Sequence, residues 1–196
     1  MSSPLIAPNP QKALLRATAL AARDALSGEH RAAAAQAVAM RGLPFEIAPN
    51  AIVAGYAAIR SEIDPFPLMG RLAAQRAQLA LPVIMARDQP LQFRVWAPGS
   101  ALRRGPLGIL EPLLEAGEIT PDILLVPLVA FDRAGHRIGY GAGHYDRTLA
   151  RLRAARKITA IGLAFAAQEI PYAAASTHDA RLDFVLTENE AIEFRS

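Results

Sequence analysis

Nine apolar residues in a row, ILLVPLVAF at 123–131, lead into a glycine-rich segment and then into a stretch with helical character. A continuous apolar run of this length is typical of a strand buried on both faces, as in a parallel sheet. Similar short runs occur at 51–57, 79–84 and 158–165, and residues 66–78, between two of these runs, favour a helix. The alternation predicts an α/β fold in three layers, with a largely parallel sheet and helices on both faces.

The first part of the chain is predicted to be a loose arm followed by a helix. Three prolines within residues 1–10 lack backbone donors and disfavour helical angles, so we expect an arm there. From Gln11 onward, an apolar stripe at helical spacing predicts a helix that ends near Gly28. The stripe comprises Leu15, Ala19, Ala22 and Leu26.

Five further segments complete the predicted order of elements. They are a helix at 29–40, a strand at 91–96, a long connection at 97–120, a helix at 144–155 and a final strand at 183–187. Neither an internal repeat nor a linker interrupts them. We therefore expect residues 11–196 to form a single domain.

Composition excludes several classes of protein. The chain has 196 residues, of which 52% are hydrophobic and 20% charged, which suits a globular domain and not a disordered chain. It contains no cysteine, which excludes disulfides, thiolate zinc sites and cysteine nucleophiles. A net charge of +3 gives no strong nucleic-acid footprint, and no apolar run is long enough to span a membrane. The N-terminus does not resemble a secretory signal, and we expect a cytoplasmic monomer that binds neither nucleic acid nor a membrane.

The glycine-rich segment after the apolar run is the strongest candidate for a binding site. Gly139, Gly141 and Gly143 let the backbone approach a ligand, and amides that enter a helix favour an anion, above all phosphate. Arg137 adds a fixed positive charge, and Asp146 stands where a carboxylate can hold Mg²⁺ together with phosphates. The alternative is a tight strand-to-helix turn in which the glycines serve geometry alone. Asp146 favours the interpretation as a nucleotide and Mg²⁺ site.

Charged residues outside this segment supply further candidates. Lys12, Arg16 and Arg23 fall within about 40° of one another on the first predicted helix. Such a basic stripe can reach a polyphosphate, although it is more often a solvated face. Near the C-terminus, either Asp179 or Asp183 can be a second metal ligand, and either can equally serve a turn.

Two residues are candidates for contact with a substrate. In the segment SEID, Asp64 is expected to cap the following helix, which leaves Glu62 free for a substrate. Trp96 can stack on a planar ring, although an aromatic residue at strand spacing is more often part of the core.

Seven segments together form a specific pattern: KALLRATALAARDAL, YAAIRSEID, LPVI, GPLGILEP, DILLVPLVAFDRAGHRIGYGAGHYDRTL, IGLAF and HDARLDFVLTE. In order and spacing they resemble the 5-formyltetrahydrofolate cyclo-ligase (methenyltetrahydrofolate synthetase) family over nearly the whole chain after the arm. The resemblance implies an enzyme that uses ATP and Mg²⁺ to close 5-formyltetrahydrofolate into 5,10-methenyltetrahydrofolate, with release of ADP and phosphate.

The resemblance also implies roles for individual residues. Phosphorylation of the formyl oxygen needs positioning and charge neutralisation more than acid–base chemistry, and Arg137 and Tyr145 are the implied catalytic residues. The residues implied for ATP are Lys12, Arg16, Arg137, Gly139, Tyr140, Gly141, Ala142, Gly143, His144 and Tyr145. Those implied for the folate are Glu62, His144 and Tyr145, to which we add Trp96 from its ring alone. Those implied for the metal are Asp146 and Asp179.

Two positions depart from the pattern of this family. Ala142 stands where the family usually has glycine or a basic residue, so we expect neither a positive φ nor a charge contact there. His144 stands where the family usually has tyrosine. Because imidazole titrates near neutrality, we hypothesise a pH-sensitive rate that His144→Tyr removes. Superimposable pH–rate profiles of the two proteins would contradict this hypothesis.

Two other functions are compatible with the same residues. One is a different phosphate-ester or acyl-transfer enzyme on a similar scaffold, with Glu62 as its general base and no role for ATP. The other is a folate- or nucleic-acid-binding module that uses a basic patch of Arg151, Arg153, Arg156 and Lys157. Binding by such a patch falls steeply with salt, which distinguishes it from the enzyme.

Overall fold

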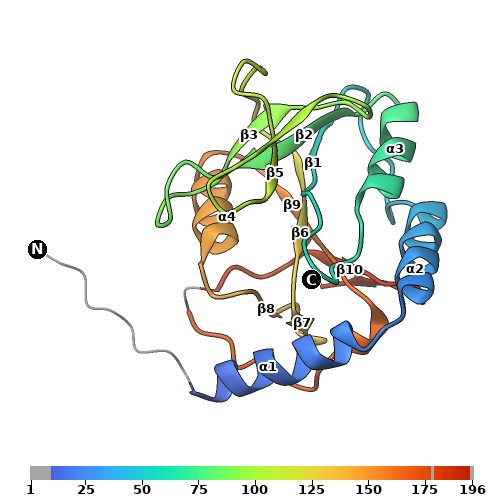
Figure 1. Ribbon diagram of the computed structural model, residues 1–196, viewed down its shortest axis with the longest axis vertical. Coiled ribbons are helices and arrows are strands. Elements are labelled where there is room, and N and C mark those ends of the chain that lie inside the picture. The colour runs from blue at the N-terminus through green and yellow to red at the C-terminus, as the bar shows by residue number, and fades with distance from the viewer. Residues whose placement is uncertain (1–9, 178, 195–196) are drawn as a thin grey trace, which may run out of the picture.

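A seven-stranded sheet lies at the centre of the computed structural model, which describes residues 10–177 and 179–194 (Figure 1). The strand order is β11-β10-β9-β6-β1-β2-β3. The strands are β1 (Ile52–Ala54), β2 (Gln78–Val83), β3 (Gln92–Val95), β6 (Ile123–Pro127), β9 (Thr159–Leu163), β10 (Phe184–Leu186) and β11 (Ala191–Glu193). The five inner strands are parallel, and the edge strands β3 and β11 run antiparallel to their neighbours. The predicted largely parallel sheet is confirmed.

Helices cover both faces of this sheet, as the sequence predicts. They are α2 (Gly28–Arg41), α3 (Phe66–Ala74) and α4 (His144–Ala155). Helices α2 and α3 pack on one face and α4 on the other (Figure 1). In β6, Leu125 belongs to the core under α2 and α3, whereas Leu124 and Val126 belong to the core under α4. The strand is apolar throughout because both of its faces are covered.

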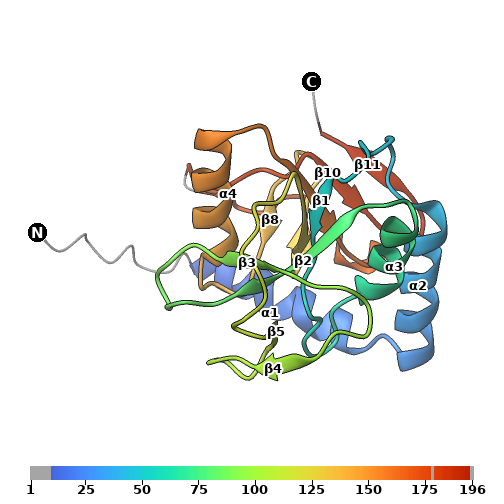
Figure 2. The same cartoon turned by 90° about the horizontal axis from the view of Figure 1, so that it is seen from above.

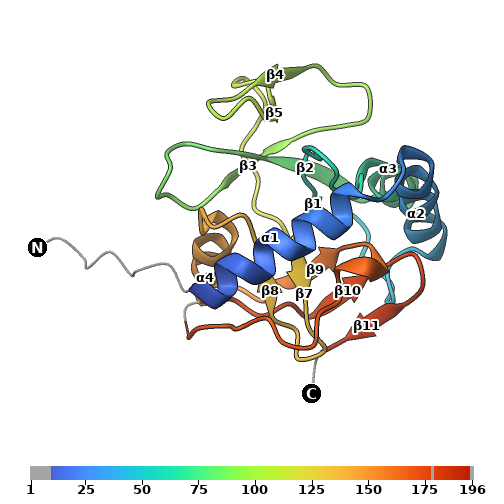
Figure 3. The same cartoon turned by 60° about the horizontal axis from the view of Figure 1, so that its bottom comes forward.

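Helix α1 (Pro10–Asp24) crosses the sheet at the carboxyl ends of its parallel strands and covers neither face (Figure 3). It contacts β7 (Ala130–Phe131) and the short helix η1 (Ala166–Gln168), which follow the carboxyl ends of β6 and β9. Its residue Ala19 packs with Val129 in a small apolar cluster. Helix α1 therefore lies at the edge where ligands of open α/β sheets bind.

Two small hairpins stand outside the main sheet. Strand β7 pairs with β8 (Arg137–Ile138), and β4 (Leu102–Arg104) pairs with β5 (Leu110–Pro112), which Figure 2 shows set apart from the other strands. The apolar run at 123–131, expected to be one strand, is thus divided, because its last residues leave the main sheet to form β7. The segment 97–120, expected to be a connection, contains a hairpin whose three-residue strands are too short to give a periodic pattern.

Two predicted helix boundaries are wrong. Gly28 begins α2 and does not end α1, because the Ser27 side chain caps α2 by accepting a hydrogen bond from the backbone N of His30 at 3.1 Å. Helix α3 ends before the predicted boundary at residue 78, because Arg76 adopts a φ of 69° and the chain turns into β2. Strand β11 is absent from the predicted elements, since three residues at an edge give no periodic signal.

The predicted arm at 1–10 lies outside the described residues except for Pro10, which is the first residue of α1. Proline is tolerated there because amides of the first helical turn have no acceptor within the helix. None of the described helices is long and apolar enough to cross a membrane.

Candidate active site

A cavity of about 610 Å³ lies at the carboxyl edge of the sheet. Its walls come from α1, from the loops after β1 and β2, from the β4–β5 hairpin, from the glycine-rich segment with the first turn of α4, and from the segment ahead of β10 that carries Ser176 and Asp179. The predicted site residues that line it are Lys12, Arg16, Glu62, Arg137, Gly139, Tyr140, Gly141, Ala142, Gly143, His144, Tyr145, Asp146 and Asp179. The fold thus gathers residues from both ends of the described chain around one space.

Arg137 and Asp146 form an ion pair at the start of α4. The buried guanidinium of Arg137, on β8, lies 2.7 Å from Asp146 Oδ1 through its Nη2. The backbone N of Ala180 donates to the same oxygen at 3.0 Å, and Arg137 Nη1 donates to the carbonyl of Ala180. Asp146 occupies the first turn of the helix, where a negative charge is favoured. These bonds fix a cation and an anion side by side on the cavity wall.

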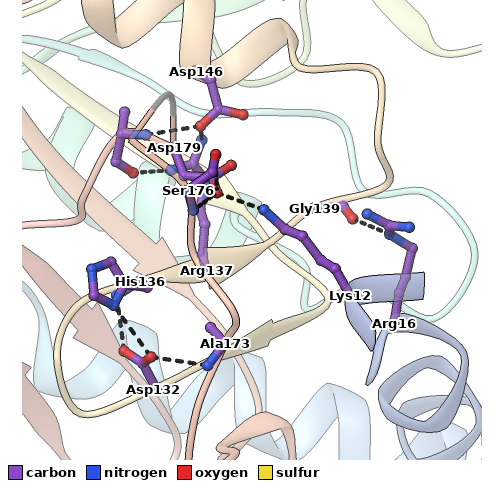
Figure 4. Close-up of polar contacts among 11 residues, drawn as sticks. Lys12, Arg16, Asp132, His136, Arg137, Gly139, Asp146, Ala173, Ser176 and Asp179 are labelled. Carbon is purple, nitrogen blue, oxygen red and sulfur yellow. Dashed lines mark hydrogen bonds and ion pairs between the residues drawn. The ribbon is translucent and has the colours of Figure 1, made fainter. Parts of the chain in front are cut away.

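Lys12 and Arg16 extend from α1 toward the same part of the site (Figure 4). Lys12 Nζ lies 2.7 Å from Asp179 Oδ2, a contact between residues 167 positions apart. The same oxygen accepts hydrogen bonds from the backbone N and the Oγ of Ser176, at 2.6 and 3.0 Å. Burial raises the pKa of Asp179, but the bonds from Lys12 and Ser176 outweigh it, and the pKa lies below its ordinary value. Arg16 Nε donates to the carbonyl oxygen of Gly139 at 2.7 Å.

The backbone requires two of the three glycines ahead of α4. Gly141 and Gly143 have φ values of 100° and 68°, in the left-handed region that glycine adopts readily. A Cβ on Gly143 would also lie 2.8 Å from Nη1 of Arg147. Gly139 has no positive φ, and a Cβ there would meet no atom within 4 Å. Ala142 also lacks a positive φ, as expected from its departure from the family pattern.

Glu62 is a buried acid in the loop that follows β1. Its side chain lines the cavity, and Oε2 accepts a hydrogen bond from the backbone N of Ile59 at 2.8 Å. Burial raises the pKa of Glu62, although the bond from Ile59 and the positive charge of Arg23 oppose the rise. Burial and the negative charge of Glu62 also raise the pKa of Tyr145, so this hydroxyl stays protonated and can donate a hydrogen bond.

Asp146 and Asp179 are the residues best placed to hold a divalent cation. Within 10–177 and 179–194, no cluster of three or more histidine and acidic side chains forms a metal cage. Each of the two aspartates uses one carboxylate oxygen for the bonds given above, and no described residue donates a hydrogen bond to its other oxygen. This donor set fits Mg²⁺, which usually takes one or two protein carboxylates and completes its shell with phosphates and water.

Trp96 is not among the described residues that line the cavity. It is buried in the core under α2 and α3 and stacks on Phe66, with ring centroids 4.9 Å apart and 21° between the planes. Its predicted contact with the folate is therefore corrected: the alternation along the strand turns the ring toward the core. An aromatic residue at strand spacing is more often part of the core, as Trp96 is here.

Arg23 and Asp183 also lie apart from the cavity. Arg23 is fully buried, so only Lys12 and Arg16 of the predicted basic stripe line the cavity. In the predicted apolar stripe, Ala22 is exposed. Asp183 Oδ2 accepts hydrogen bonds from the backbone N of Ala160 at 2.7 Å and from Arg153 at 3.0 Å. Of the two aspartates left open by the sequence, Asp183 thus supports the start of β10, and Asp179 reaches the cavity.

His144 lines the cavity, and one of its ring nitrogens contacts the protein backbone. Its Nδ1 lies 3.1 Å from the carbonyl oxygen of Gln89, so the neutral ring carries its proton on Nδ1. Its Nε2 is buried and has no partner among the described residues. The pH-sensitive rate expected from His144 stays a prediction.

The arginines of the predicted basic patch form hydrogen bonds and ion pairs with other residues of the chain. Arg151 donates to the carbonyl of Leu91 at 2.7 Å, Arg153 pairs with Asp183, and Arg156 pairs with Asp122. These contacts tie α4 to neighbouring loops. They give the patch a structural role that does not depend on a nucleic acid.

Two buried acids, Glu111 and Asp132, were missed by sequence reasoning. Glu111, in the β4–β5 hairpin, lines the cavity, accepts a hydrogen bond from the backbone N of Ile84 at 3.0 Å, and lies 2.9 Å from Arg103. It therefore anchors the hairpin to the end of β2. Its signal in the sequence is the segment GPLGILEP, which carries the family resemblance without assigning a role to the acid.

Asp132 anchors the turn between β7 and β8. Its Oδ1 accepts hydrogen bonds from the backbone N of Ala134 and of His136 at 3.0 Å each. Its Oδ2 accepts one from the backbone N of Ala173 at 3.0 Å, and Figure 4 shows the contacts of Asp132 with His136 and Ala173. Burial raises the pKa of Asp132, but the bonds from Ala173 and His136 lower it below the ordinary value. Asp132 thereby links the hairpin that carries Arg137 to the segment that leads to Asp179.

Comparison with known proteins points to a single family. Residues 8–188 match the model of the 5-formyltetrahydrofolate cyclo-ligase family. The chain is 36% identical over 151 residues to the 5-formyltetrahydrofolate cyclo-ligase of Mycolicibacterium smegmatis, which covers 71% of this chain and 75% of that protein. It is 34% identical over 123 residues to that of Haemophilus influenzae, which covers 60% of this chain and 65% of that protein. The NMR structure of the Aquifex aeolicus 5,10-methenyltetrahydrofolate synthetase superimposes with a TM-score of 0.78 and 30% identity, covering 94% of this chain and 93% of that chain.

Proposed function

The chain belongs to the 5-formyltetrahydrofolate cyclo-ligase family of enzymes, and from this premise we propose that it converts 5-formyltetrahydrofolate into 5,10-methenyltetrahydrofolate while ATP becomes ADP and phosphate. The family match and the named relatives confirm the family resemblance and the expectation of an enzyme. One observation supports the full reaction: a single cavity holds cations and carboxylates suited to a metal-bound polyphosphate together with a buried acid suited to a pterin.

The proposed chemistry activates a formyl oxygen, which is otherwise a poor leaving group. This oxygen attacks the γ-phosphorus of ATP and ADP departs. The neighbouring amine nitrogen of the folate then attacks the formyl carbon, loses its proton, and phosphate leaves as the ring closes. The enzyme contributes mainly position and charge, which is the usual basis of phosphoryl transfer.

Each cation of the cavity has a part in this proposal. Arg137 donates to the transferred phosphoryl group and balances the charge that develops on it. Lys12 and Arg16 hold the remaining phosphates, and the backbone of 139–145 approaches them where glycines leave room. Tyr145, the last residue of this segment, lines the cavity together with Glu62, keeps its hydroxyl protonated and orients the folate.

Asp146 and Asp179 would hold Mg²⁺, which when bound offsets the negative charge of the phosphates. Each aspartate has one carboxylate oxygen to which no described residue donates, and the metal would take that oxygen. Arg137 and Lys12 can then share their charge between the paired carboxylate oxygen and the phosphates. The two ion pairs keep the polar part of the cavity close to neutral until the substrates arrive.

Near-UV absorbance tests the reaction directly, because the methenyl product is conjugated and the substrate is not. We expect absorbance to rise when purified protein meets 5-formyltetrahydrofolate, ATP and Mg²⁺, and to stay flat when ATP or the metal is withheld. No rise with all components present, while the folate still binds, would instead favour a folate-binding module.

Asp146→Asn tests the metal part of the proposal. Because the amide removes one negative charge from the metal site, we expect turnover to fall at least about a hundredfold, whereas folate binding changes little. Turnover comes from steady-state kinetics and folate affinity from calorimetry. Equal losses of both would contradict a metal role for Asp146.

A further inference from the structure

Arg23 of α1 is a fully buried cation that the reaction above does not use. Its Nε donates to Ser61 Oγ at 3.0 Å, its Nη1 to the carbonyl oxygen of Leu128 at 3.3 Å, and its Nη2 to Tyr140 Oη at 2.5 Å. None of these acceptors carries a charge. Because a guanidinium keeps its proton in a protein, a buried one needs negative charge nearby.

Two hydroxyl groups connect Arg23 to two carboxylates. Ser61 Oγ accepts from Arg23 and donates to Asp24 Oδ1. Tyr140 Oη accepts from Arg23, and its hydroxyl interacts with the side chain of Glu62, which lines the same cavity. Each hydroxyl has a single proton, so accepting from Arg23 directs that proton toward the carboxylate. The positive charge of Arg23 thus acts on both acids through neutral oxygens.

We propose that Arg23 is a positioning residue that acts through the Tyr140 hydroxyl on Glu62 and sets the direction and negative charge of that acid. The inference rests on the proposed function, in which Glu62 contacts the folate. Tyr140 is also held through its ring, whose centroid lies 5.6 Å from the guanidinium carbon of Arg23 and 5.8 Å from that of Arg60. Since Tyr140 belongs to the glycine-rich segment, the same contact joins the nucleotide side of the cavity to its folate side.

The charges around Glu62 agree with this assignment. The titratable and charged groups that act on it or respond to it are Arg23, Arg60, Tyr56, Tyr140 and Tyr145. Burial raises the pKa of Glu62, and the charge of Arg23 and the bond with Tyr140 lower it. Loss of either group therefore raises the pKa further, and Glu62 becomes protonated at a higher pH. A protonated carboxyl is a poorer acceptor for the N–H groups of a pterin.

Carbon-13 NMR of glutamate-labelled protein measures the titration of Glu62 without any turnover, with the signal assigned by its loss in Glu62→Gln. In Arg23→Lys and Tyr140→Phe we expect the midpoint of Glu62 to move to higher pH. A lysine has its three donors on one nitrogen and cannot match the spread of the Arg23 Nε, Nη1 and Nη2, and phenylalanine removes only the hydroxyl. An unmoved midpoint in Tyr140→Phe overturns the proposal. That variant decides alone if Arg23→Lys does not fold, because Tyr140 is partly exposed.

Arg31→Lys and Tyr172→Phe are matched controls, since neither residue lines the cavity. Arg31 bonds the carbonyl of Leu26, and Tyr172 is largely exposed. Both controls are expected to titrate like the wild type. A midpoint that moves equally in the controls overturns the specific link between Tyr140 and Glu62.

Steady-state kinetics test whether the link serves the substrate. At pH 6 we expect Arg23→Lys and Tyr140→Phe to raise the KM for the folate about tenfold and that for ATP less than about threefold. The acid limb of kcat/KM for the folate moves to higher pH in step with the NMR midpoint. A folate KM that stays constant while the midpoint moves overturns the positioning role. Absence of turnover in the wild type overturns the proposed function instead, and the NMR midpoint then still decides the link between Arg23 and Glu62.

Discussion

The two halves of α1 carry cations in contrasting settings. In the first half, Lys12 and Arg16 border the cavity and bond to Asp179 and to the carbonyl of Gly139, partners that a ligand can replace. In the second half, Arg23 is enclosed and bonds to three uncharged oxygens of the protein. One helix therefore presents two cations to the cavity and encloses a third, and burial, not residue type, separates the two settings.

Removal of the enclosed cation is expected to have the largest effect on folding. In Arg23→Met, three acceptors lose their donor, and an unsatisfied buried polar group costs about 1–3 kcal/mol. We expect the free energy of unfolding to fall by about 3 kcal/mol, measured by urea denaturation. Lys12→Met, the matched change in the open half of α1, is expected to lose less than about 1 kcal/mol. Equal losses would remove the distinction between the two halves.

Removal of the open cation is expected to act on the nucleotide. Lys12→Met loses a charged hydrogen bond to phosphate, worth about 1.5–3 kcal/mol, so the KM for ATP should rise about ten- to a hundredfold. The KM for the folate should change little. Steady-state kinetics with each substrate varied in turn provide the measurement, and a change confined to the folate would refute the placement of Lys12 on phosphate.

Ser61→Ala separates the two hydroxyl contacts of Arg23 in the second half of α1. It removes the hydroxyl between Arg23 and Asp24 and leaves the Tyr140 branch intact. We expect a loss of about 1 kcal/mol in the free energy of unfolding and no movement of the Glu62 midpoint. A midpoint that moves as far as in Tyr140→Phe would show that the two branches are not separate.

The smallest expected effect is on the pH dependence of stability, and it concerns the ion pair between Lys12 in the first half of α1 and Asp179. Because the pKa of Asp179 is lower in the folded chain, its contribution is complete above the unfolded value of about 3.9 and is lost as pH falls through the folded pKa. Wild type should therefore lose more stability below about pH 4 than Lys12→Met, by less than about 1 kcal/mol. Urea denaturation at pH 7 and at pH 3 measures this difference, and equal losses in both proteins would contradict it.

The sequence predicted those features that depend on local pattern. The apolar run of β6, the glycines before α4 and the charge of Asp146 are all visible in consecutive residues, and the structure brings the last two into one cavity. The chemical roles of these residues still await the experiments above. What the pattern cannot show is which other segment covers a given face.

Arg23 and Trp96 show where that limit lies. Helical spacing places Arg23 on the same side of α1 as Lys12, but only the folded chain brings Ser61 and Leu128 over the second half of the helix. Likewise, strand alternation gives the face on which Trp96 stands and not the neighbour it meets there. In each case a contact between distant segments decided whether the side chain reached the cavity.

The contact between Lys12 and Asp179 spans 167 positions and sets an order of assembly. During synthesis α1 emerges first, and the carboxylate that neutralises its open cation follows only after nearly all of the described chain. Closing so long a loop costs chain entropy before the contact stabilises anything. The part of the cavity wall that Lys12 and Asp179 form is thus among the last parts to be completed. A chain arrested short of Asp179 would present an unneutralised cationic helix to any polyanion it meets.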